Sequence, residues 1–143
     1  MVANTSPIFT EKADVSINNG TTLPSPITTA TGDYTGVSPN HQLVHTAGAD
    51  GSYVRRLQFK ALGTNVASVA RVYLNNGSDP TVAANNVLFD EVSLPVTTAS
   101  NVAATSTIVL PMEMAINPAF RIYVGLGTTV AAGWDVTAVG GQY

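Results

Sequence analysis

Apolar and polar residues alternate in short runs along most of the chain, from residue 52 to the end. In the first run Leu57, Phe59 and Ala61 alternate with Arg56, Gln58 and Lys60, and a period of two is typical of a strand with one buried face. Clusters of Gly, Asn, Asp and Pro separate the runs and indicate turns. The pattern predicts strands at residues 52–62, 68–75, 87–94, 106–114 and 119–126 and a last strand from Trp134 through Ala138.

Two features qualify this strand pattern. Pro111 lies inside the 106–114 run and has no backbone N–H, so we expect an edge strand or a bend there. Residues 80–91 show only partial helical spacing, and the pair Asn85-Asn86 weakens a helix because Asn side chains compete for backbone hydrogen bonds. The strand pattern therefore dominates the prediction.

The N-terminal part of the chain differs in composition. Residues 18–40 are rich in Thr, Pro and Gly, which favours extended or looped backbone with little regular pairing. We predict an N-terminal strand near 14–18 and an extended arm or loop within residues 1–44, followed by a β-sandwich core at 45–143. With two short upstream strands, the chain is predicted to be all-β: a single-domain antiparallel β-sandwich, jelly-roll-like, of about eight strands.

Charged residues are scarce. The 143 residues include 6 Lys and Arg, 9 Asp and Glu, 2 His and no Cys, for a net charge of −3. The 10% of charged residues is well below the ~25% of ordinary soluble domains, which hints that neighbouring subunits cover part of the surface. Without a basic stripe we expect no nucleic-acid partner, and without a long apolar run or a leader pattern we expect no membrane span and no secretory signal.

Few residues are candidates for chemistry. His41 and His45 are four apart, but in a strand that spacing places them roughly 13 Å apart, too far to share a metal ion, so we interpret them as surface or loop residues. Asp90 and Glu91 are adjacent, and neighbours in a strand point to opposite faces. We therefore predict no catalytic residues, no metal site and no cofactor.

A short sequence similarity between two predicted strands suggests an interaction surface instead. Arg71-Val72-Tyr73-Leu74 resembles Arg121-Ile122-Tyr123-Val124, and both place Arg and Tyr opposite the aliphatic residues. Two such strands would form cross-strand Arg–Tyr contacts on an outer sheet face, either solvated or buried in a subunit or shell interface. The candidate interface residues are Arg56, Lys60, Arg71, Tyr73, Arg121 and Tyr123. Arg55 is expected to point away from Arg56 and Lys60.

A family resemblance is found in three sequence segments, residues 45–54, 61–77 and 126–143. They resemble small virion structural proteins of tailed bacteriophages, and within that group the head decoration, or cement, proteins. The resemblance covers about residues 45–143 and carries over no functional residues. It implies a homo-oligomer, trimer favoured over dimer, that binds the phage major capsid protein. It also implies synthesis in the host cytoplasm and a final location on the capsid exterior.

The leading hypothesis is thus a non-enzymatic capsid decoration protein. The second is a tail, baseplate or fibre component that binds a receptor or glycan, with sugars stacking on Tyr34, Tyr53, Tyr73 or Tyr143. The third is a small glycan hydrolase that uses Asp90, Glu91 or Glu113, for which no spacing of carboxylates gives support.

Overall fold

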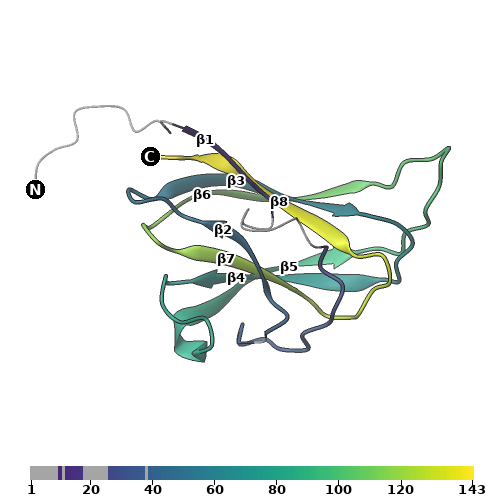
Figure 1. Cartoon of the computed structure of the whole chain (residues 1–143), viewed down its shortest axis with the longest axis horizontal. Helices are drawn as coiled ribbons and strands as arrows, with labels where there is room; N and C mark the ends of the chain where they lie inside the picture. The colour runs from purple at the N-terminus through teal and green to yellow at the C-terminus, as the bar shows by residue number, and fades with distance from the viewer. Residues whose placement is uncertain (1–9, 11, 18–25, 38) are drawn as a thin grey trace, which may run out of the picture.

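The computed structural model describes residues 10, 12–17, 26–37 and 39–143. These residues form eight strands in two layers (Figure 1). In chain order the strands are β1 (Lys12–Ile17), β2 (Gln42–Thr46), β3 (Ser52–Ala61), β4 (Ser68–Asn75), β5 (Asn86–Leu94), β6 (Thr107–Ile116), β7 (Arg121–Leu126) and β8 (Trp134–Gln142). The all-β prediction is confirmed.

The strand order is that of a jelly roll. One sheet has the order β1-β8-β3-β6 and the other β2-β7-β4-β5, and every pairing between neighbours is antiparallel. The first strand thus pairs with the last, the second with the seventh, the third with the sixth and the fourth with the fifth. This is a long hairpin wrapped into a sandwich, which brings residues far apart in sequence side by side.

The core lies between the two sheets and consists of the alternate apolar residues that the pattern predicts. Trp134 and Val136 of β8 and Leu57 and Phe59 of β3 are fully buried. The facing sheet contributes Ala70, Val72, Ile122, Val124 and Leu126. Burying one such large side chain contributes about 1.5–3 kcal/mol, so these two opposed faces are the main source of stability.

Most strand bounds agree with the predicted ranges to within two residues, and the main difference is in the last strand. β8 continues to Gln142, because Gly140 and Gly141 pair with β3 as well as β1. The 80–91 segment contains only a single 3-10 turn, Ala83–Asn85, before β5 begins. Pro111 lies in β6, an edge strand, as its missing N–H predicts.

The N-terminal residues are part of the sandwich. β1 and β2 are edge strands, and Ile27 bridges to Trp134 of one sheet while Ala30 bridges to Leu126 of the other. Residues 26–31 therefore cross from one sheet to the other, with two isolated bridges as their only strand pairing. The predicted division at 44/45 falls inside β2, and the part of the predicted arm at 18–25 and 38 lies outside the described residues.

Candidate interaction surfaces

The outer face of the β2-β7-β4-β5 sheet is covered by the chain itself. Tyr73 is fully buried there, and its hydroxyl donates a hydrogen bond to the backbone carbonyl of Asp33. Arg71 donates from Nε to Glu91 at 3.0 Å and from Nη2 to the Tyr34 hydroxyl at 2.8 Å. The prediction that Arg71 and Tyr73 lie on an open outer face is therefore wrong, because residues 33–37 pack over them.

The burial of this face has electrostatic consequences. Removal from water disfavours the phenolate and raises the pKa of Tyr73 to about 12. For Asp33, burial alone would raise the pKa, but hydrogen bonds from the Thr35 N–H and hydroxyl and from the Val37 N–H outweigh it and lower the pKa to about 2. Both groups are thus held in their ordinary charge states at neutral pH.

The register of β4 against β7 corrects the expected Arg–Tyr contacts. The two strands are neighbours, but they are antiparallel, so Tyr73 lies opposite Tyr123, Arg71 opposite Gly125 and Arg121 opposite Asn75. The reversed direction separates the two arginines along the strands. Arg121 instead donates from Nη1 to the carbonyl of Ser78 at 3.3 Å.

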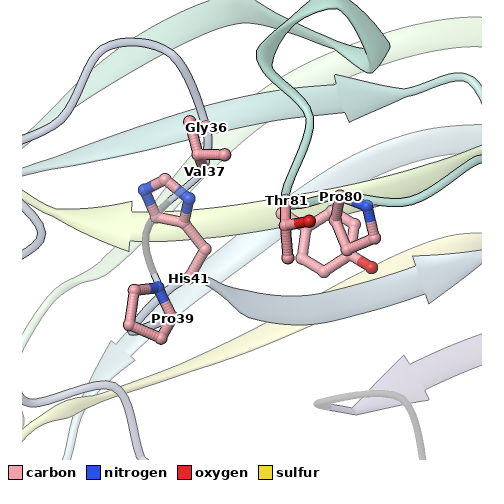
Figure 2. A pocket seen from close by; sticks show the side chains of 7 residues that line it. Gly36, Val37, Pro39, His41, Pro80 and Thr81 are labelled. Carbon is pink, nitrogen blue, oxygen red and sulfur yellow. The ribbon is translucent and has the colours of Figure 1, made fainter.

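A hollow of about 300 Å³ lies beside this covered face (Figure 2). It is lined by Gly36, Val37, Pro39, His41, Pro80, Thr81 and Tyr123. The His41 ring stacks on Tyr73 with the ring centroids 4.4 Å apart, and it lies so close to the Gly125 backbone that a Cβ there would meet its Cδ2 at 2.4 Å. Burial lowers the pKa of His41, so its imidazole is neutral at pH 7.

His45 lies in β2 and is almost fully buried, which corrects the expectation of a surface or loop residue. Its Nδ1 is 3.1 Å from the Ser16 hydroxyl and 3.6 Å from an Asp14 carboxylate oxygen. Burial lowers the pKa of His45, and Asp14 partly opposes that shift. The cluster fastens β1 to β2 across the edge of the sandwich.

This Ser, His and Asp set does not have the arrangement of a hydrolytic triad. In a triad the carboxylate and the nucleophile bind opposite ring nitrogens, whereas Ser16 and Asp14 both approach Nδ1 of His45. Elsewhere, Glu91 binds Arg71 on the outer face while Asp90 lies opposite Val72 of the core. No group of three or more His, Cys, Asp or Glu side chains is placed to hold a metal ion among the described residues.

The outer face of the β1-β8-β3-β6 sheet is open in the described structure. Val15 of β1 is 59% exposed and Val109 of β6 is 46% exposed. Arg56 lies between Val139 and Pro111 on this face and donates to Gln58 at 3.0 Å, and Lys60 donates to the carbonyl of Thr105. Of the six predicted interface residues, Arg56 and Lys60 are thus the two on this open face.

Arg55 differs from its prediction because of a bulge. The β3 register shifts between Val54 and Arg56, which interrupts the alternation and leaves Arg55 exposed at 3.7 Å from Glu113. The Tyr53 hydroxyl donates to the same carboxylate. Of the four tyrosines named as exposed stacking surfaces, Tyr73 is buried, which corrects that expectation, whereas Tyr34 is 59% exposed with Arg71 over its ring.

One surface was not predicted from the sequence, because it is distinguished by the absence of charged residues and not by a cluster of them. It is the end of the sandwich formed by the connections 62–67, 95–106 and 127–133, none of which contains Asp, Glu, Lys, Arg or His. The signal was visible in the sequence as three uncharged stretches between strands.

The chain matches no family model, no curated protein and no solved structure. Within the described residues, the structure has no helix with the length and apolar character needed to cross a bilayer.

Proposed function

We propose that this chain is a non-enzymatic structural protein of a bacteriophage virion, which decorates the capsid and stabilises it by bridging capsid subunits. The observation that carries the proposal is a charge-poor jelly roll whose ionisable groups are dispersed in pairs over two sheets, while one sheet face is open among the residues that the structure describes. Jelly rolls occur in viral capsid and lectin domains, an analogy that favours a structural or binding role.

The stabilising effect needs binding surfaces and no reactive groups. A protein that binds the assembled shell and not its separated subunits shifts the equilibrium towards the shell by mass action. The open face of the β1-β8-β3-β6 sheet suits this task because it presents Val15 and Val109 together with the cations Arg56 and Lys60, of which Lys60 lies opposite Asp135. We infer that the shell surface it meets is apolar with acidic groups, complementary to those cations.

The test is to add the purified protein to heads that lack it. Electron microscopy with a gold label on the protein is expected to place it on heads, and bound heads are expected to withstand higher temperature and stronger osmotic shock than bare heads. Label confined to tails, or heads with unchanged resistance, would contradict the proposal.

A double charge-reversal variant tests whether the open sheet face is the one that binds the head. Arg56→Glu with Lys60→Glu is expected to reduce head binding at least tenfold, because two favourable charge contacts become unfavourable. Arg121→Glu is the matched control, since Arg121 lies on the other sheet, where its Nη1 donates to the carbonyl of Ser78. Equal loss in both variants would argue against this face.

One observation favours the tail or fibre alternative with glycan binding. The hollow beside His41 and Tyr123 has about the smallest volume found for ligand sites, and its walls of Pro39 and Pro80 give flat apolar contact (Figure 2). Binding on a glycan array that is lost in Tyr123→Ala and kept in Tyr143→Ala would support that function in place of head decoration.

A further inference from the structure

Residues 33–37 lie over the outer face of the β2-β7-β4-β5 sheet without joining it, and we call them the cover. Among the described residues, no backbone–backbone hydrogen bond links the cover to a strand. Side chains of the sheet hold it instead, with hydrogen bonds from Tyr73 to the Asp33 carbonyl, from Arg71 to the Tyr34 hydroxyl at 2.8 Å and from Asn86 to the Gly36 carbonyl at 3.2 Å. Gly36 is the one buried residue of the cover. A segment with so few buried apolar contacts opens at a low cost in free energy.

The cover is a rigid unit that follows an unpacked glycine. The Asp33 carboxylate accepts hydrogen bonds from the Thr35 N–H at 2.8 Å and from the Val37 N–H at 2.9 Å, so the segment is folded on itself. Gly32, which precedes it, has φ +60°, and a Cβ there would meet no atom within 4 Å. Because glycine adopts either sign of φ and this one is free of packing, rotation at Gly32 can swing the cover as one body.

The cover buries polar atoms that it does not pair. The His41 ring points towards Gly36 and Val37 of the cover (Figure 2). Among the described residues, both ring nitrogens of His41 and Nη1 of Arg71 are buried without a hydrogen-bond partner. An unpaired buried donor or acceptor costs free energy, because it has left water without gaining a partner. Opening the cover returns these atoms to water, which offsets part of the contacts that are lost.

His41 links the cover to proton binding. The titratable groups that face its ring are Asp33 of the cover, Arg71 (paired with Glu91) and Tyr73 of β4, and Tyr123 across the hollow. Burial has the largest effect and lowers the pKa of His41, and Arg71 lowers it further. The Gly36 backbone and the Asp33 carboxylate only partly oppose this shift, so the covered ring resists protonation.

The sign of the pH effect follows from the shift at His41. With the cover open the ring is hydrated and has the ordinary pKa of about 6.5, which is higher than its pKa under the cover. The open state therefore binds the proton more strongly than the closed state. The closed state has its full advantage above about pH 6.5 and loses it progressively as the pH falls towards the lower pKa.

We propose that residues 33–37 form a hinged cover that swings open about Gly32 when His41 takes up a proton, and so uncovers the side chains of His41, Arg71 and Tyr73. Gly36 and Val37 also line the hollow beside His41, so their movement extends this hollow over the sheet face. The cover is a device of the chain itself and does not depend on capsid binding, which we assign to the other sheet.

The test is NMR relaxation dispersion of the backbone amides in the purified full chain, which detects opening on the microsecond-to-millisecond timescale. Between about pH 7.5 and about pH 5.5 the open population at residues 33–37 is expected to rise by at most about tenfold, the limit for one proton at one unit below the ordinary histidine pKa. His41→Gln is expected to abolish this pH dependence. His45→Gln is the matched control, because His45 is a buried histidine whose ring contacts Ser16 of β1 in place of the cover.

A second test displaces the cover without a proton. Gly36 and Gly32 both have positive φ, so alanine strains the backbone at either position. At Gly36 the new Cβ would in addition lie 3.0 Å from the Tyr73 ring and from Asn86. Gly36→Ala is therefore expected to displace the cover at neutral pH and to raise the pKa of His41, followed by NMR titration, towards about 6.5. Gly32→Ala is the control and is expected to leave both unchanged.

Several results would overturn the proposal: residues 33–37 without exchange at either pH, a pH dependence that persists in His41→Gln, or one that is lost equally in His45→Gln. Titration of His41 in the unsubstituted protein is a further check that needs no variant, since a pKa at or above about 6.5 would also contradict the proposal. Amide spectra verify that each variant is folded.

Discussion

Asn65 holds both backbone groups of Gly133: its Oδ1 accepts a hydrogen bond from the Gly133 N–H at 2.9 Å, and its Nδ2 donates one to the Gly133 carbonyl at 3.1 Å. Gly133 has φ +88°, and a Cβ there would lie 2.7 Å from the Cβ of Pro26. A buried amide and a glycine together thus fix the turn that leads into β8.

Replacing Asn65 with Ala is expected to lower the free energy of unfolding by about 2–4 kcal/mol, since it removes the acceptor of the Ala132 and Gly133 N–H groups, while the Gly133 carbonyl keeps its hydrogen bond from the Leu62 N–H. Urea denaturation measures the change. The exposed Asn101 at the loop tip is the control, and Asn101→Ala is expected to have little effect. Equal stability of the two variants would contradict this role of Asn65.

Gly140→Ala is expected to destabilise the protein by at least about 3 kcal/mol, because the new Cβ would lie 2.0 Å from the backbone oxygen of Tyr53 and force β8 away from β3. Thermal unfolding followed by circular dichroism reports the effect. Gly127→Ala is the matched control, since its Cβ would meet neighbours at 3.5 Å or more. A Gly140→Ala protein with the wild-type melting temperature would show that the strands can separate without cost.

Tyr73→Phe is expected to lower the free energy of unfolding by about 1–2 kcal/mol, because it removes the hydrogen bond to the Asp33 carbonyl. Hydrogen exchange of residues 33–37 is expected to accelerate more than exchange in the core strands. Tyr53→Phe also removes a hydroxyl contact, to Glu113, but at an exposed site where a small effect is expected. Unchanged exchange at 33–37 would mean that the hydroxyl does not hold the segment.

Stability is expected to fall as the pH drops through about 6.5, the ordinary pKa of histidine. Burial lowers the pKa of His45 in the folded protein, so the unfolded chain binds a proton first; the stabilisation is complete above that pH and is lost towards the lower folded pKa. Asp14 opposes the shift, and His41 adds to the fall with the same sign. Unfolding free energies across this range are expected to show a smaller slope in His45→Gln, and an unchanged slope would contradict the assignment.

The strand pattern predicts the fold well because each core face follows a period of two: Leu57, Phe59 and Ala61 face inward as expected. The covered face was not predictable in the same way. Tyr73 and Arg71 occupy outward positions, and their burial depends on residues 33–37 folding back over them, which alternation does not encode. Arg55 escaped the pattern because a bulge adds one residue and breaks the period.

The jelly-roll order leaves β5 and β6 as edge strands, and both are irregular. The β5 ladder shifts by one residue at Phe89, and β6 contains Pro111 and a bulge with Glu113 at φ +46°. A foreign strand that tried to pair there would meet a missing N–H and misaligned carbonyls. Neither β5 nor β6 can therefore template the growth of a fibre, and the other two edges, β1 and β2, lie against each other through Ser16 and His45.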